Sequence, residues 1–103
     1  MITITIPHPT DPSYDEHHGP ARWTEPLTDA HYVWEKAGID LRQFEGRASG
    51  ACARSVHELI NAILDNPDQF AGVSYWYLQA VTAHLTGLFF TLRRRPDGIV
   101  HVS

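Results

Sequence analysis

The segment from Gln69 to Leu92 contains no Asp, Glu, Lys or Arg, and it stops at three consecutive arginines, Arg93, Arg94 and Arg95. It is long enough to cross a bilayer, so its polar content decides between a membrane span and a buried element. Several Gln, His, Ser and Thr side chains interrupt it, and each would need a hydrogen-bond partner in hydrocarbon. The segment is therefore predicted to be the core of a globular domain, with no membrane partner.

Chain length and charge narrow the classes of function. The 103 residues suit a single domain, residues 1–103, with one hydrophobic core. A formal net charge of -4 argues against nucleic-acid binding over the whole surface. Residues 1–70 hold eleven of the twelve acidic residues, whereas residues 71–103 hold three arginines and only Asp97. The C-terminal third is therefore locally basic.

The cysteine content and the N-terminal residues indicate the cellular compartment of the protein. Cys52 is the only cysteine, so the chain forms no internal disulfide and does not look like a secreted, disulfide-stapled scaffold. Residues 1–9 lack a basic region followed by an apolar run, so we expect no signal peptide. Together these features predict a cytoplasmic protein.

The N-terminal third predicts a strand, a long loop and a helix. Ile2, Ile4 and Ile6 alternate with threonines, which is the period of a strand with one covered face. Residues 7–27 are rich in Pro and His, and the prolines favour a long loop without regular structure. A helix is predicted over residues 29–37, between an N-capping threonine and a terminating glycine.

The rest of the chain predicts two more helices and a hairpin. A helix is expected from Ser49 or Ser55 to Asp65, because apolar residues recur on one helical face. The uncharged segment carries a helical stripe, but Gly87 weakens it and a strong turn signal follows at residues 95–98. We therefore expect a helix from about Tyr75 to Thr86, then a strand over 88–94 that forms a hairpin with 99–103.

These elements predict an α+β fold. The N-terminal strand and the C-terminal hairpin would form an antiparallel sheet packed against two or three helices. Ile2, Ile4 and Ile6 would then be buried against apolar side chains of the helices, namely Leu59, Ile63, Leu78, Val81 and Leu85. No internal repeat or interdomain linker is visible, which agrees with one domain.

Aromatic residues indicate a protein-binding surface. The tryptophans and the Tyr75-Trp76-Tyr77 run cannot all be buried in so small a core. Trp and Tyr are the side chains that most often anchor protein interfaces. A partner surface is therefore predicted from Trp23, Tyr75 and Trp76, with another protein or a second copy of the chain as the partner. The alternative is that these aromatics pack as a small cluster under the long loop.

A second hypothesis is DNA binding. The run VSYWYLQAVTAHL followed by RRRPDGIVHVS resembles the recognition helix and wing of a winged helix-turn-helix domain. The resemblance covers about half the chain and implies that helix residues face bases or phosphates while the arginines contact the DNA backbone. The implied residues are Tyr75, Gln79, Thr82, Thr86, Arg93, Arg94 and Arg95. The exposed helix face, however, carries no Arg, Lys or Asn, and the chain is acidic.

A third hypothesis is a metal- or thiol-dependent enzyme built on His57, Glu58 or Cys52. His57-Glu58 begins like the zinc-protease helix motif, but Asn61 stands where the second His belongs. Cys52 lies near an expected helix N-terminus beside arginines, a setting that favours an anion site or a reactive thiol; the alternative is a small buried residue. The histidines and carboxylates of residues 8–18 match no closed zinc pattern. No metal, cofactor or catalytic residue is therefore predicted.

The sequence thus favours a small accessory protein, of the kind that bacterial or phage inhibitors represent, which acts by binding protein and not by catalysis. A winged-helix-like DNA-binding protein is the alternative, and an enzyme is the third hypothesis.

Overall fold

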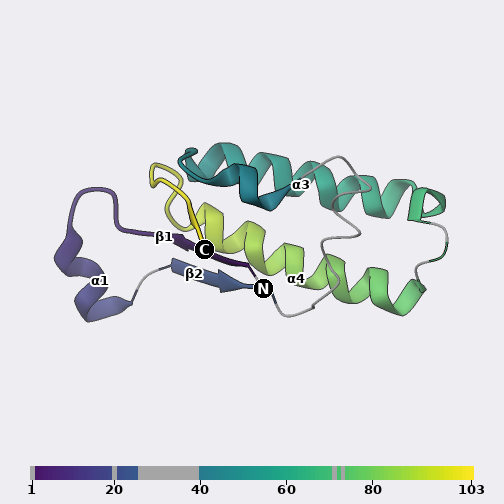
Figure 1. Cartoon of the computed structure of the whole chain (residues 1–103), viewed down its shortest axis with the longest axis horizontal. Coiled ribbons are helices and arrows are strands. Elements are labelled where there is room, and N and C mark those ends of the chain that lie inside the picture. The colour runs from purple at the N-terminus through teal and green to yellow at the C-terminus, as the bar shows by residue number, and fades with distance from the viewer. Residues whose placement is uncertain (1, 20, 26–39, 71, 73) are drawn as a thin grey trace.

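A computed structural model describes residues 2–19, 21–25, 40–70, 72 and 74–103. In this part of the chain a three-stranded antiparallel sheet accompanies three α-helices, so the predicted α+β class is confirmed (Figure 1). The predicted helix over residues 29–37 lies outside the described residues. The elements, in chain order, are β1 (Thr3–Ile6), α1 (Pro12–His18), β2 (Ala21–Thr24), a 3-10 helix (Leu41–Phe44), α3 (Ser49–Asp65), a second 3-10 helix (Pro67–Phe70), α4 (Tyr75–Arg93) and β3 (His101–Val102).

The sheet is built around β1. Its strand order is β2-β1-β3, and Ile4 of β1 pairs with Trp23 on one side and with Val102 on the other. Ile4 and Ile6 are wholly buried, whereas the alternating threonines of β1, Thr3 and Thr5, are only partly buried. The alternation in the sequence therefore predicted the strand and the burial of Ile4 and Ile6 correctly. Ile2, which was also expected to be buried, lies before β1 and is only partly buried.

Helices α3 and α4 run side by side in opposite directions and form the longest part of the molecule (Figure 1). The predicted helix ending at Asp65 is confirmed, and it begins at Ser49, the earlier of the two expected starts. Ser49 is buried, and its hydroxyl donates a 2.7 Å hydrogen bond to the Leu92 carbonyl at the far end of α4. The helices bury one continuous apolar cluster with the sheet, including Val56, Leu59, Ile63, Leu78, Val81, Leu85 and Leu88.

The predicted strand over residues 88–94 is wrong, because α4 continues through Gly87 to Arg93. A glycine inside a helix costs about 0.5–1 kcal/mol relative to alanine. Leu88 and Leu92 prolong the buried stripe of α4 and are wholly buried, and each contributes about 1.5–3 kcal/mol. The free energy gained by burying Leu88 and Leu92 therefore exceeds the cost of having Gly87 inside the helix. None of the described helices, α4 included, is long and apolar enough to span a membrane.

The C-terminal segment therefore does not form the predicted hairpin, and its backbone pairs with other segments of the chain. The expected turn over residues 95–98 is present, since the Gly98 N–H donates to the Arg95 carbonyl at 2.9 Å. A Cβ at Gly98 would lie 2.5 Å from Cγ2 of Ile6, so only glycine fits this close approach. The chain then forms a β-bridge between Ile99 and Ala48, and β3 pairs with β1.

The prediction of a long loop over residues 7–27 is also wrong, because this segment contains α1 and β2. Asp11 caps α1 by accepting a hydrogen bond from the Ser13 N–H. Pro12 takes the first helical turn, where a missing N–H costs nothing. Among the described prolines of this segment, Pro7 and Pro9 lie between β1 and α1, and Pro12 lies at the start of α1.

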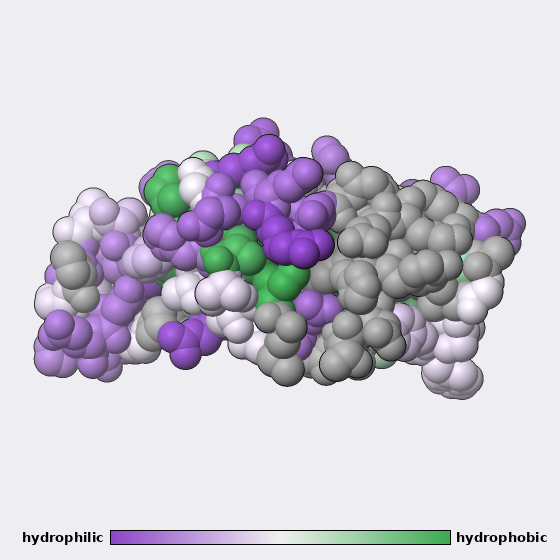
Figure 2. All heavy atoms as spheres, in the orientation of Figure 1, coloured by the Kyte–Doolittle hydropathy of each residue, from purple (hydrophilic) through white to green (hydrophobic). Residues whose placement is uncertain are grey.

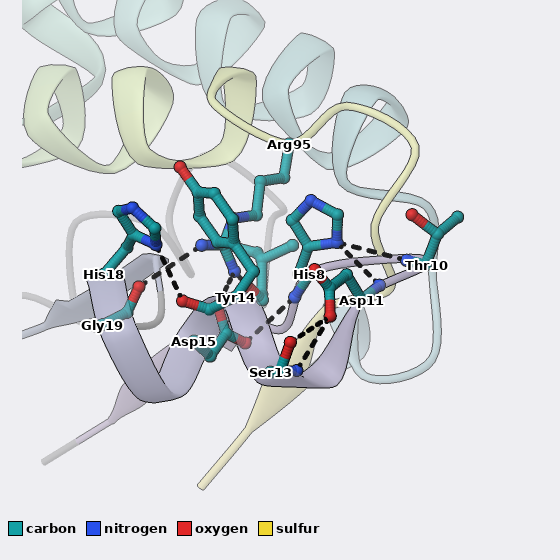
Figure 3. A network of polar contacts seen from close by, with 10 residues as sticks. His8, Thr10, Asp11, Ser13, Tyr14, Asp15, His18, Gly19 and Arg95 are labelled. Carbon is teal, nitrogen blue, oxygen red and sulfur yellow. Dashed lines mark hydrogen bonds and ion pairs between the residues drawn. The ribbon is translucent and has the colours of Figure 1, made fainter.

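One buried arginine fastens α1 to the rest of the molecule (Figure 3). Arg95 forms a 2.7 Å ion pair with Asp15 and a 2.8 Å hydrogen bond to the Ile6 carbonyl, and its second terminal nitrogen lies 3.3 Å from the Gly19 carbonyl. The Tyr14 ring lies below the guanidinium, 5.4 Å from its carbon. The α1 end of the surface is mostly hydrophilic in Figure 2, which fits an attachment by polar contacts.

Candidate functional site

The side of α4 opposite its buried residues is exposed and uncharged. Trp76 is 77% exposed and Phe90 is 61% exposed, and the positions between them on this side are small or polar. We call this surface the outward face of α4; its members are Trp76, Gln79, Ala83, Gly87 and Phe90, all exposed. No charged residue occurs in the chain between Tyr75 and Leu92. The outward face is therefore an aromatic and apolar surface without charge.

The first turn of α4 is held in a defined geometry. The Ser74 hydroxyl caps the helix by accepting a 3.1 Å hydrogen bond from the Tyr77 N–H. Trp76 lies edge-on to the Tyr75 ring, with the ring centres 5.8 Å apart. The Tyr75 hydroxyl in turn accepts a 2.7 Å hydrogen bond from the Gln79 amide. These contacts limit the rotamers of both aromatic side chains, which reduces the entropy cost of binding.

A groove of about 550 Å³ lies beside the outward face, between the end of α3 and the start of α4. Four predicted DNA-binding residues, Tyr75, Gln79, Thr82 and Thr86, line it together with apolar side chains such as Leu64. The Thr82 and Thr86 hydroxyls donate to carbonyls of α4 itself, each at 2.8 Å. The structure thus brings these four residues to one face of α4, but their common surface is mainly apolar.

Trp23 lies apart from Tyr75 and Trp76. It stands on β2, is only partly exposed, and its indole N–H donates a 3.1 Å hydrogen bond to the His84 carbonyl. His84 is eight residues beyond Trp76, or about 12 Å along the helix axis. The predicted trio is therefore not brought together: Tyr75 and Trp76 share one exposed turn, while Trp23 packs between the sheet and α4.

The three arginines are consecutive in the chain but have different surroundings. The Arg93 guanidinium lies over the Phe89 ring, 5.5 Å from its centre, and Arg94 is exposed. Arg95 is only 9% exposed and is engaged by Asp15 and the Ile6 carbonyl. The wing that the DNA-binding hypothesis requires would begin at residues 88–93, which are helical. The arginines therefore do not form one basic strip.

Asp15 is the charged partner in the α1 attachment. The hydrogen bond from the His8 backbone N–H is the main reason that its pKa is lowered, and the contact with Arg95 acts in the same direction against desolvation. The carboxylate is therefore ionised wherever α1 is docked at neutral pH. This cluster serves to orient α1, which lies at the opposite end of the molecule from the first turn of α4 (Figure 1).

Cys52 does not have the setting of a reactive thiol. It is 1% exposed, and burial raises the pKa of its thiol, although Arg47 acts in the opposite direction. The α3 N-terminus is also occupied, because the N–H groups of Ser49 and Gly50 donate to the carbonyls of Gly98 and Pro96. The alternative of a small buried residue is the one that the structure shows.

The candidate metal ligands are dispersed or already engaged. Within the described ranges, no three His, Cys, Asp or Glu side chains gather in a way that would hold a metal ion. His8 accepts hydrogen bonds from the backbone N–H groups of Thr10 and Asp11 through Nδ1. His57 and Glu58 are both exposed on α3.

Sequence reasoning identified Trp76 but missed Phe90. Phe90 falls in the strand predicted over residues 88–94. That prediction obscures the seven-residue spacing that relates Trp76, Ala83 and Phe90 along one helix. Seven residues are nearly two helical turns, so the three positions share one side of a continuous helix.

Comparison with protein-family models, with curated proteins and with solved structures finds no significant match to this chain.

Proposed function

We propose that this protein acts by binding protein through the outward face of α4, and that the chain it binds is a second copy of itself. The observation that carries the proposal is the pair of exposed aromatic side chains, Trp76 and Phe90, on one uncharged side of α4. Burying exposed Trp and Phe at an interface contributes more than burying most other side chains.

The spacing on α4 supports self-association in particular. Ala83 lies seven residues after Trp76 and seven before Phe90. Two antiparallel copies of α4 related by a two-fold axis at Ala83 would place each Trp76 against the partner's Phe90. The small residues Ala83 and Gly87 would let the two helices approach closely between these pairs. One surface thus supplies both halves of a closed interface.

The lack of charge on the outward face is compatible with a copy of the chain as the partner. The protein carries a net charge of -4, so most encounters between two copies are repulsive. The outward face is a long helical surface without Asp, Glu, Lys or Arg, and it lets two copies meet without opposing like charges. Four aromatic side chains, each burying about 150 Å², supply roughly 600 Å². Neighbouring residues bring the buried area to about 1,000 Å², which predicts a reversible dimer.

Sedimentation equilibrium over a range of concentrations tests the proposal. We expect a monomer-dimer equilibrium that Trp76→Ala weakens at least about tenfold, because a central interface aromatic contributes about 2 kcal/mol or more. Ala83→Arg should abolish the dimer, since it places two like charges at the axis. Ile99→Ala is the matched control: Ile99 is an exposed aliphatic side chain, at 46%, but it lies outside α4.

A cross-link tests the arrangement of the two copies. In an Ala83→Cys variant the new thiols meet at the two-fold axis, and mild oxidation should give a covalent dimer. An Ile99→Cys variant should not, because Ile99 lies outside α4 and is not part of its outward face. A wild-type protein that stays monomeric at every concentration, or a dimer unaffected by Ala83→Arg, would refute the proposed function.

A further inference from the structure

A second cavity, of about 570 Å³, lies between the first half of α3 and the last turns of α4. Arg54 and His57 line it from α3, and Phe89 and Arg93 line it from α4. Ala53 and Pro96 contribute apolar surface to it. The volume lies within the range of small-molecule sites in proteins. We call this cavity the basic pocket.

The basic pocket concentrates positive charge in an acidic protein. The exposed guanidinium groups of Arg54 and Arg93 make no ion pair with any carboxylate of the described chain. None of the residues that line the pocket is Asp or Glu. The two arginines give the pocket a formal charge of about +2. Unpaired cationic side chains around a concave surface favour an anionic ligand.

Two of the polar side chains are oriented by the same aromatic ring. The Arg93 guanidinium lies 5.5 Å from the centre of the Phe89 ring, and the His57 ring centre also lies 5.5 Å from it, tilted by 32°. Stacking uses the flat faces of a guanidinium and leaves the N–H groups at its edge free to donate. Phe89 therefore holds donors in place before a ligand arrives, which reduces the entropy cost of binding.

We infer that the basic pocket binds a small organic phosphomonoester, with Arg54 and Arg93 on the phosphate. A phosphomonoester carries about -1.5 to -2 at pH 7, which matches two guanidinium groups, and its three free oxygens accept from forked donors. A phosphate group alone leaves most of the volume unfilled, so an apolar or planar group would lie against Ala53, Phe89 and Pro96. A nucleoside monophosphate has this chemistry.

A monoester suits the pocket better than a nucleic-acid strand. Each phosphodiester of a strand carries a single charge, and a strand needs a continuous row of cationic side chains along its backbone. Arg95 is buried in the α1 attachment, and Arg94 lines a different cavity, with His8 and Asp97. The two guanidinium groups at the basic pocket therefore match one compact dianion.

Titration with adenosine 5′-monophosphate, followed by ¹H-¹⁵N NMR and calorimetry, tests the assignment. We expect saturable binding with shifts at Arg54, His57, Phe89 and Arg93, weaker binding of inorganic phosphate, and no binding of adenosine. Arg54→Gln and Arg93→Gln should each weaken binding at least about tenfold, as expected for loss of a charge-assisted hydrogen bond. Arg94→Gln is the matched control and should leave the affinity unchanged.

Four outcomes would overturn the inference. They are no saturable binding of the monophosphate, equal binding of adenosine, an equal loss of affinity in Arg94→Gln, and single-stranded DNA binding that strengthens with length beyond the monophosphate. The Ala83→Arg variant should bind the monophosphate normally, because the outward face of α4 is not part of the basic pocket. The inference is thus tested separately from self-association.

Discussion

The α1 end of the molecule and the α3–α4 pair are held in place by different forces. Helix α1 is attached through Arg95, whose ion pair and hydrogen bonds are directional. The helix pair is held by a row of buried Leu, Ile and Val side chains, which have no preferred partner atom. Directional contacts fix the orientation of a short, polar helix, whereas apolar burial supplies most of the free energy of folding.

The difference also shapes what each region offers to a partner. The core face of α4 satisfies the need for apolar burial, so the opposite side has no structural task, yet it carries Trp76 and Phe90. The polar residues of α1, by contrast, are largely engaged with one another (Figure 3). Exposed aromatics without a role in the fold are the stronger indication of a binding surface.

The largest effect is expected from Leu88→Ala. Leu88 is wholly buried in the apolar core, and removing its side chain leaves a cavity. Urea unfolding should show a loss of about 2–5 kcal/mol in the free energy of unfolding. Leu64→Ala, on the exposed side of α3, should change stability by no more than about 0.5 kcal/mol. Equal losses in the two variants would show that the helix pair is not held by its buried row.

Acidification should release α1 while the helix pair stays folded. The pKa of Asp15 is lowered in the folded protein, so its contribution to docking is present above the ordinary value of 3.8 and is lost as pH falls through the folded value. Heteronuclear NOE values of the α1 amides should fall below about pH 4, while those of α3 remain high. Rigid α1 amides throughout the titration would contradict the polar attachment.

Two variants assign that transition to one carboxyl group. The pKa of Asp11 is also lowered, through its hydrogen bonds to Ser13, so its titration must be separated from that of Asp15. Asp11→Asn keeps a good N-cap but does not titrate, and the acid transition should persist in it. Asp15→Asn should have mobile α1 amides already at neutral pH and should show no transition.

The sequence predicted the elements whose signal is local. Alternating isoleucines identified β1, and the one-sided apolar pattern identified α3. Strand β2 was missed because four residues flanked by prolines carry little signal, and its stability comes from pairing with β1, which lies earlier in the chain. The extent of α4 was underestimated because Gly87 and the following turn suggested a break, while the burial of Leu88 and Leu92 depends on α3.

In the candidate site, too, features with a local sequence signal were predictable and features that depend on contacts between distant segments were not. The exposure of Trp76 was expected from three adjacent aromatics, since one helical turn cannot bury all of them. The place of Phe90 on the same helix face as Trp76 can be predicted only when α4 is known to extend to Arg93, because the spacing then applies to one continuous helix. The basic pocket depends on how α3 and α4 are aligned, which brings Arg54 to Arg93. No local pattern in the sequence contains that alignment.

The smallest effect, and one of opposite sign, is expected from Gly87→Ala. Gly87 is exposed within α4, and an added Cβ would have Trp23 Nε1 as its nearest neighbour at 4.0 Å, an ordinary contact. Alanine should therefore raise the free energy of unfolding by about 0.5–1 kcal/mol through its helix propensity. Wild type and variant are compared at one concentration, because self-association shifts apparent stability. A lower free energy of unfolding would contradict this expectation. It would mean that the added methyl group disturbs Trp23 and its hydrogen bond to the His84 carbonyl, so that this side of α4 packs against the sheet more closely than its exposure indicates.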